Sequence, residues 1–321
     1  QTLAQVTTAL LDGMDQVLAR EKPDVVLVQG DTTTTFATSL AAFYQRVPVG
    51  HVEAGLRTGD KFSPFPEEIN RRLATHVADY HFAPTTVARD NLMREGIGDE
   101  QILVTGNTVI DALLYMRQQL AENPVLLPQF VRDLPRDKRF ILVTAHRRES
   151  FGEQMAQICR AIRSVALSRP DVVVIYPVHL NPNVQQPVRA ILEGIPNLRL
   201  MEPQDYVAFV ALMERADILL TDSGGIQEEG PSLGKPVLVM RPVSERPEAI
   251  AAGTACLVGT DPARITSAVN RLLDDSAFYQ QMTRRSNPYG DGHAAERIVN
   301  FLLQKLFANS KAKMTAATST N

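Results

Sequence analysis

The chain has 321 residues, and this length predicts two domains, because a single α/β layer is usually smaller. Charged residues make up 21% and apolar residues 44%, and the net charge of -3 leaves no basic face for nucleic acid or an acidic membrane. The longest apolar runs have the length of a strand, well short of the roughly 20 residues of a membrane helix.

The two cysteines, Cys159 and Cys256, lie far apart in the sequence and lack the spacing of metal ligands. We expect both to be reduced thiols that fill the core of a cytoplasmic protein. The chain begins at Gln1, already inside a helical pattern, which favours a fragment of a longer protein. A processed or trimmed chain would look the same.

The first 120 residues alternate helix and strand patterns and predict an N-terminal Rossmann-like domain. Apolar residues recur at helical spacing over residues 3–20, and the buried strand VVLVQG (25–30) follows. A helix to Tyr44, the strand VPVGHVEAG (47–55) and a long loop come next. Pro66, Glu67 and Glu68 then open a helix, as a first-turn proline and first-turn acids should. The short strands YHFAP (80–84) and QILVTGN (101–107) and a helix over 109–120 complete the series.

Residues 121–138 are proline-rich and aperiodic and predict a linker between two domains. A second series of strands and helices then starts at RFILVTAH (139–146) and continues through VVVIYPVH, LRLMEP, ADILLTDS and KPVLVMR. The alternation predicts a second doubly wound parallel sheet over 139–290. Closing helices are predicted over 263–284 and 293–306, and residues 309–321 read as a disordered tail.

Polar side chains gather where several of these strands end. In open α/β sheets the carboxyl ends of the strands bind ligands, so the default site is the cleft between the two domains. A single acid such as Asp31 could equally be a helix cap. Repetition over several strands favours a site, with the polar groups Asp31, His51, Glu53, His146, Arg147, Arg148, His179, Asp222 and Ser223.

The segment TDSGGIQEE (221–229) is the clearest candidate for an anion site. A strand ends, a Gly-Gly turn follows, and a helix begins, so backbone amides and the helix N-terminus can approach a phosphate. Glu229 could accept hydrogen bonds from ribose hydroxyls, although Glu228 and Glu229 could also be a solvated pair. Arg147, Arg148 and Arg246 are candidates to hold a diphosphate without a metal.

Several other kinds of chemistry lack their signatures. The six histidines are scattered without metal-ligand spacing, so we expect no metal. There is no GxSxG elbow, no GxxxxGK[ST] loop and no GxGxxG motif, which disfavours a serine hydrolase, ATP hydrolysis and a dinucleotide redox cofactor.

Long ordered motifs over nearly the whole chain resemble the bacterial, non-hydrolysing UDP-N-acetylglucosamine 2-epimerases. The runs are GDTTTT (30–35), GHVEAGLRTGD (50–60), SPFPEEINRR (63–72), TGNTVIDAL (105–113), HRRESFG (146–152), YPVHLNPNV (176–184), LTDSGGIQEE (220–229), PSLGKPVLVMR (231–241) and ERPEA (245–249). The resemblance implies a GT-B-like fold of two Rossmann-like domains, with the ligand in the interdomain cleft and a C-terminal helix, 291–308, that crosses back.

The resemblance also implies a reaction. Members interconvert UDP-GlcNAc and UDP-ManNAc without a metal or redox cofactor, by eliminating UDP to a 2-acetamidoglucal and adding it back from the other face. The product supplies surface polysaccharide synthesis. For this chain the resemblance implies a cytoplasmic homodimer that needs no cofactor.

The family's functional residues can be carried over where the motifs match. Asp31, Glu53, Glu67 and His146 match the catalytic set. Arg147 and His179 resemble contacts of a second, regulatory UDP-GlcNAc. The positions that match UDP and substrate contacts, with Phe209 near the uracil, are Gln204, Phe209, Ser223, Gly224, Gly225, Glu229 and Arg246.

The sequence also departs from the family pattern. The family begins with a strand and a GTRPE loop whose arginine touches the diphosphate, and a QHR-type motif follows; neither occurs after Gln1. We therefore expect this chain alone to be weakly active. Ala145 and Gly230 replace the usual glycine and alanine. A hydrolysing 2-epimerase that releases ManNAc and UDP, a GT-B glycosyltransferase and a non-catalytic nucleotide-sugar binding fragment remain alternatives.

Overall fold

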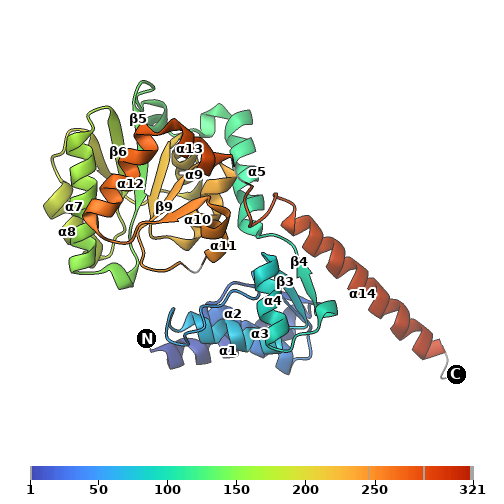
Figure 1. The fold of residues 1–321 in the computed structure, drawn as a ribbon. Helices are drawn as coiled ribbons and strands as arrows, with labels where there is room; N and C mark the ends of the chain where they lie inside the picture. Colours follow the sequence, from blue (N-terminus) through green and yellow to red (C-terminus); the bar gives the residue numbers. More distant parts are fainter. Residues whose placement is uncertain (1, 245, 285, 319–321) are drawn as a thin grey trace. The chain divides into compact units, whose positions relative to one another are not determined.

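The computed structural model describes residues 2–244, 246–284 and 286–318, with side chains described as far as residue 306. The chain forms two compact units (Figure 1). Unit 1 comprises Gln1–Asp111 and Tyr289–Asn321, and unit 2 comprises Ala112–Pro288. Each unit is built on a parallel sheet with helices packed against it, which confirms the predicted α/β class with two Rossmann-like domains.

Unit 1 has a four-stranded sheet in the order β1-β2-β3-β4, in which all neighbours are parallel. The short apolar runs between turn residues form the strands, as expected for a sheet covered by helices. The strands are β1 (Val26–Gln29), β2 (Val49–Val52), β3 (Tyr80–Ala83) and β4 (Ile102–Val104). The helices are α1 (Leu3–Glu21), α2 (Thr33–Tyr44), α3 (Glu67–Val77), α4 (Thr86–Arg94) and the 3-10 turn η1 (Asp99–Gln101), with the start of α5 (Thr108–Glu122).

The last helix, α14 (Ala294–Thr318), belongs to unit 1 although unit 2 precedes it in the sequence. Ile298 and Leu302 are buried in one cluster with Val52 and Phe82 of the sheet. The Asp111 carboxylate accepts hydrogen bonds from the first backbone amides of α14, at 3.1 and 2.8 Å, which satisfies otherwise unpaired donors. The helix covers residues 309–318, where the sequence predicts a disordered tail, and 319–321 lie outside the described residues.

Unit 2 has a six-stranded parallel sheet in the order β10-β9-β8-β5-β6-β7. Its core joins the inner faces of α7, α8 and α12 to one face of the sheet. The strands are β5 (Arg139–Thr144), β6 (Val172–Pro177), β7 (Leu198–Met201), β8 (Ile218–Thr221), β9 (Val237–Val239) and β10 (Ala255–Leu257). The helices are α7 (Glu153–Ser168), α8 (Pro182–Leu192), α9 (Tyr206–Arg215), α10 (Gly224–Ser232), α11 (Pro247–Ala252), α12 (Pro262–Asp274) and α13 (Ser276–Thr283), with η3 (Arg148–Ser150) after β5.

The order of strands in unit 2 reverses between β5 and β8. The chain runs outward from β5 to β6 and β7, and then returns to the other side of β5 with β8, β9 and β10. Such a reversal leaves a crevice between the loops at the carboxyl ends of the two central strands, and ligands of doubly wound sheets bind there. The segments after β5 and β8 are those in which the sequence places His146, Asp222 and the Gly-Gly turn.

Residues 121–138, predicted to be a linker, belong to unit 2. They contain the 3-10 turn η2 (Pro124–Leu126) and the short helix α6 (Gln129–Arg132), which contacts α9. Val131 and Leu134 are buried, and Arg215 donates a hydrogen bond to the Pro135 carbonyl at 2.7 Å. The change from unit 1 to unit 2 comes after Asp111, earlier than the proline-rich segment.

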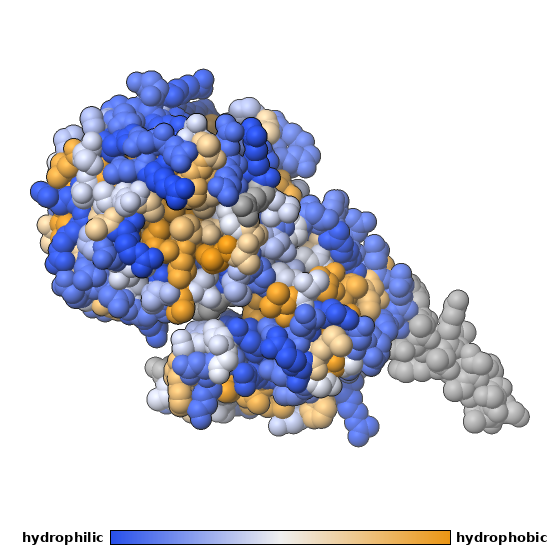
Figure 2. Space-filling model, viewed as in Figure 1, coloured by the Kyte–Doolittle hydropathy of each residue, from blue (hydrophilic) through white to orange (hydrophobic). Residues whose placement is uncertain are grey.

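The surface in view in Figure 2 is mostly hydrophilic, and its apolar areas are spread over both units. Within the described part of the chain, no helix combines the length and the apolar character that a bilayer span requires.

The turn after β2 depends on a glycine. Gly55 has φ +91°, and a Cβ there would lie 2.2 Å from the carbonyl oxygen of Ala88 on α4. Gly59, further along the same loop, has φ +84° with no atom within 4 Å of such a Cβ. Gly55 and Gly59 thus both have a positive φ, but only at Gly55 would an added Cβ clash with another atom.

We predict that Gly55→Ala lowers the free energy of unfolding of unit 1 by at least about 3 kcal/mol, because the clash adds to the cost of the positive φ. Gly59→Ala should cost only about 1–2 kcal/mol, since it carries the backbone term alone. Urea unfolding, monitored through hydrogen exchange of the β2 amides, measures the free energy of unfolding of both variants. Equal losses in the two variants would contradict the packing of this loop against α4.

Candidate active-site residues

Asp31 follows β1 and is held by two residues of α3. Arg71, which is buried, donates from Nη2 to the Asp31 carboxylate at 2.6 Å. Asn70 donates from Nδ2 to the Asp31 carbonyl at 3.1 Å. The cap of α2 is Thr32, whose side chain accepts from the amide of Thr35. The alternative that Asp31 is a helix cap is therefore wrong, and its carboxylate has a different role.

Glu53 follows β2 in a strained conformation. Its φ of +65° is rare for a residue with a side chain and costs energy that the surroundings must offset. Its carboxylate oxygen Oε2 lies 3.5 Å from the point that a Cβ on Gly30 would occupy. Gly30 therefore leaves room for the Glu53 carboxylate beside the turn that carries Asp31.

Glu67 is the first residue of α3, where the helix dipole favours a carboxylate. Its neighbour Glu68 is fully buried and accepts hydrogen bonds from the amides of Thr58 and Gly59, at 3.1 and 3.4 Å. Glu68 thus ties the long loop after β2 to α3. The same helix binds Asp31 through Arg71, so unit 1 connects the elements that carry its three predicted catalytic acids.

In unit 2 one buried carboxylate joins the segments after β5 and β8. The Asp222 oxygen Oδ2 accepts from the backbone amides of His146 and Arg147, at 2.7 and 2.8 Å. Its other oxygen lies 3.6 Å from Nδ1 of His146. The His146 ring stacks on His179, with centroids 5.5 Å apart and planes 14° apart. Burial lowers the pKa of His146, Asp222 opposes that change, and the charges of Arg147 and His179 add to the lowering.

The N-terminus of α10 is flanked by two arginines. A Cβ on Gly224 would lie 3.5 Å from Nη2 of Arg147 and 3.8 Å from Cζ of Arg246. Arg246 is itself ion-paired with buried Glu228, which fixes its guanidinium at this helix end. Ser223 precedes the first turn as the N-cap residue. Backbone amides, a helix dipole and two cations in one place form a site suited to a diphosphate.

Glu229 lies one turn further along α10 and is 7% exposed. The Tyr206 hydroxyl, from the start of α9, lies 3.3 Å from its Oε1. Burial raises the pKa of Glu229 to about 7, the hydrogen bond from Tyr206 opposes this, and the charge of Glu228 adds to it. The alternative of a solvated Glu228 and Glu229 pair is therefore wrong, because both side chains of α10 are buried.

The remaining predicted contacts of unit 2 lie at the start of α9. Gln204 precedes the helix, and its Nε2 donates to the Glu202 carbonyl at 2.7 Å. Phe209 is half-buried within the first two turns of α9, three residues after Tyr206. Tyr206 thus links α9 to Glu229. Sequence reasoning missed it, as it missed Arg71, because neither contact has a local sequence signal.

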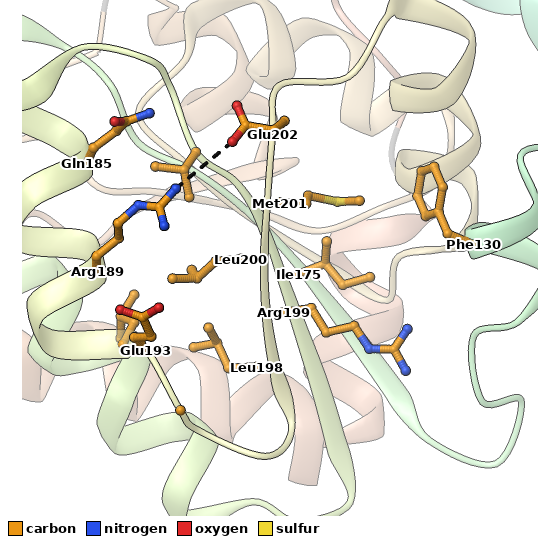
Figure 3. Close-up of a pocket in the computed structure, with 13 residues that line it drawn as sticks. Phe130, Ile175, Gln185, Arg189, Glu193, Leu198, Arg199, Leu200, Met201 and Glu202 are labelled. Atoms are coloured by element: carbon orange, nitrogen blue, oxygen red, sulfur yellow. Dashed lines mark ion pairs between the residues drawn. The ribbon is translucent and has the colours of Figure 1, made fainter.

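Another region of unit 2 is hollow but contains none of these groups. A cavity of about 620 Å³ lies at β7, the outer strand of the sheet, between α8 and the Phe130 ring of α6 (Figure 3). Arg189 and Glu202 form an ion pair of 4.0 Å on its wall. No predicted site residue lines this cavity. The predicted site residues of unit 2 gather instead near the N-terminus of α10. In the described residues, no group of three or more His, Cys, Asp or Glu side chains could hold a metal ion.

The two Rossmann-like units, each on a parallel sheet, define a protein of the GT-B-like class. The family description "UDP-N-acetylglucosamine 2-epimerase" matches residues 1–303, and the chain belongs to this family. The enzyme of that name from Escherichia coli K12 is 57% identical over 305 residues, which are 94% of this chain and 81% of that protein. The enzyme from Campylobacter jejuni is 48% identical over 95% of this chain and 81% of its own length.

Solved structures of UDP-GlcNAc 2-epimerases are also similar to this chain. The UDP-GlcNAc 2-epimerase of Neisseria meningitidis, bound to UDP-GlcNAc, has a TM-score of 0.91 at 48% identity, covering 95% of this chain and 82% of that one. The Methanocaldococcus jannaschii enzyme, in complex with UDP-GlcNAc and UDP, has a TM-score of 0.81 at 35% identity, with coverage of 95% and 82%. A trehalose 6-phosphate synthase from Burkholderia multivorans, 14% identical with a TM-score of 0.63, shares the fold.

The pKa of Glu229 predicts a pH dependence of stability. The ordinary value of about 4.5 applies to the unfolded chain and about 7 to the folded protein, so between these values the folded state retains a proton that the unfolded state has lost. Stability is therefore greatest below the lower value and falls as the pH rises through the higher one.

We expect the difference in unfolding free energy, wild type minus Glu229→Gln, to fall by roughly 2–4 kcal/mol from pH 4.5 to pH 8. Urea unfolding of both proteins, read from amides of unit 2, measures the difference. A difference that does not change with pH would show that Glu229 titrates at its ordinary value.

Proposed function

We propose that the protein interconverts UDP-N-acetylglucosamine and UDP-N-acetylmannosamine by eliminating UDP and adding it back on the other face of the sugar. Family membership over nearly the whole chain carries the proposal, together with 57% identity to a protein named for this reaction. Two structural relatives hold UDP-GlcNAc, and one of these also holds UDP.

The groups of unit 2 suit the nucleotide. The amides at Ser223, Gly224 and Gly225 and the arginines Arg147 and Arg246 would hold the diphosphate at the start of α10. Glu229 would accept hydrogen bonds from the ribose hydroxyls, and Phe209 would lie against the uracil. Gln204 would be a further contact of UDP. Fixed cations and amides fit a mechanism in which UDP must leave and return without escaping.

The reaction explains why several acids are needed. The proton on sugar carbon 2 has no adjacent carbonyl to acidify it, so departure of UDP must lead and build positive charge at carbon 1. A carboxylate stabilises that charge and takes the proton, and epimerisation requires a second acid on the opposite face. We assign these roles to Asp31, Glu53 and Glu67 as a set. His146, neutral at pH 7 because of its lowered pKa, exchanges a proton with the departing or returning UDP.

We also propose a second, regulatory nucleotide-sugar site that uses Arg147 and His179. The His179 ring stacks on His146, so a ligand that moves His179 would alter the surroundings of a catalytic group. We further propose that the protein is a cytoplasmic homodimer, that it needs no metal or redox cofactor, and that its product supplies surface polysaccharide synthesis.

The reaction can be tested in heavy water with the protein expressed from its complete gene. UDP-GlcNAc should give UDP-ManNAc that carries deuterium at carbon 2, and recovered UDP-GlcNAc should acquire deuterium as well. A chelator should not change the rate. Stoichiometric free ManNAc and UDP would show a hydrolysing enzyme, and binding of UDP-GlcNAc without exchange would show a binding protein.

The same assay tests the assigned residues. Glu53→Gln, Glu67→Gln and His146→Asn should each lower turnover about 100-fold or more, since each removes a proton-transfer or charge-stabilising group. UDP affinity measured by calorimetry should stay near that of the wild type. Glu193→Gln, an exposed acid at the cavity directly after α8, is the matched control and should keep full turnover.

A further inference from the structure

Three consecutive carbonyls, from the last residue of β1 into the turn before α2, each accept a hydrogen bond from a side chain of a different element. Thr35 on α2 donates to the Gln29 carbonyl at 2.7 Å. His51 on β2 binds the Gly30 carbonyl through Nε2 at 2.8 Å. Asn70 on α3 donates to the Asp31 carbonyl at 3.1 Å. The turn that presents Asp31 is therefore fixed from three directions.

The His51 side chain has no other hydrogen-bond partner among the described residues. Its ring is fully buried, and the other ring nitrogen, Nδ1, has no hydrogen-bond partner there. A carbonyl can only accept, so Nε2 must carry the proton and Nδ1 must be bare. Burial lowers the pKa of His51 to about 4, which keeps the ring neutral at pH 7. Burying a polar ring costs free energy unless the ring is hydrogen-bonded. The one hydrogen bond of the His51 ring goes to the Gly30 carbonyl of the turn.

The bonded carbonyl belongs to Gly30, which is next to Asp31 in the chain and close to the Glu53 carboxylate. Gly30 has φ +74° and precedes Asp31, and the Glu53 carboxylate lies 3.5 Å from the place of its missing Cβ. His51 is also two residues before Glu53, which directly follows the same strand. A change in the orientation of the Gly30 peptide would therefore move Asp31 and alter the space into which the Glu53 carboxylate fits.

We propose that His51 is a positioning residue for the reaction, which acts by holding the Gly30 carbonyl so that Asp31 and Glu53 keep their relative placement. The proposal rests on the proposed function. His51 touches neither substrate nor the reacting atoms in this account, and its effect reaches the reaction through the turn.

The test compares two substitutions of similar size at His51. Glutamine places an amide N–H at the same number of bonds from Cα as Nε2 and can donate to Gly30, whereas methionine has the length without the donor. We expect His51→Met to lower kcat for epimerisation about 10- to 100-fold, as expected for reacting groups displaced by about 1 Å. KM for UDP-GlcNAc should change less than about threefold, because the proposed nucleotide contacts lie in unit 2. His51→Gln should recover most of kcat.

The control is the histidine opposite His51 in the sheet. His81 on β3 pairs with His51 in the parallel register and is equally buried, and in the described part of the chain its ring makes no hydrogen bond to the turn before α2. His81→Met disturbs the same layer without touching the turn. Its kcat per folded molecule should therefore match that of the wild type.

Two results would overturn the proposal: a wild-type kcat in His51→Met, or equal losses in the glutamine and methionine variants. A measurement on the wild type covers the case in which His51→Met does not fold. Nitrogen-15 shifts of His51 should show a proton on Nε2 and none on Nδ1 from pH 6 to pH 8, and the opposite tautomer would also overturn it. If the wild type performs no epimerisation while this tautomer is present, the proposed function fails and the structural bond remains.

Discussion

The buried carboxylate of Asp222 is the contact on which the arrangement of unit 2 most depends. It lies where the order of strands reverses, and one of its oxygens binds two successive amides of the segment after β5. A buried charge is stable only when it is hydrogen-bonded in this way. The contact fixes His146 and Arg147 relative to α10, which begins two residues after Asp222. The helix end, Arg147 and His146 are thereby kept in one place, and Glu228 adds Arg246 to them.

Unit 1 also fixes its functional groups, but through several contacts and not through one buried carboxylate. Its acids are placed by a network in which neutral and charged side chains bind the backbone of one turn and of one loop. Arg71 offsets the charge of Asp31, Glu68 gathers the amides of the loop after β2, and the strained backbone at Glu53 turns its carboxylate back over Gly30. Strain of this kind persists only where surrounding contacts enforce it, and it is typical of functional sites. Such rigidity suits a reaction in which a proton must be taken from one face and returned to the other.

The sequence predicts the α/β class, the strand-helix order and the polar strand ends, because these follow from short-range periodicity and from glycine and proline positions. It cannot decide whether Asp31 caps α2 or serves another purpose, since Thr32 can cap the same helix. It cannot reveal Arg71 or Tyr206, whose partners are distant in the chain. It leaves open whether Glu228 and Glu229 are exposed, because an acidic pair is usually solvated, whereas α10 buries both side chains. β10 and α11 were missed because each is only a few residues long.

The central claim is that UDP departs from the sugar and returns while it is held at the start of α10. Positional isotope exchange tests it directly, with UDP-GlcNAc that carries oxygen-18 in the oxygen between carbon 1 and the β-phosphorus. Departure leaves equivalent oxygens on the β-phosphate, so return should scatter the label into non-bridging positions of both recovered nucleotide sugars. Scattering requires both that the carbon–oxygen bond breaks and that the β-phosphate turns before UDP returns. Label that remains in the bridge through many turnovers would contradict this account.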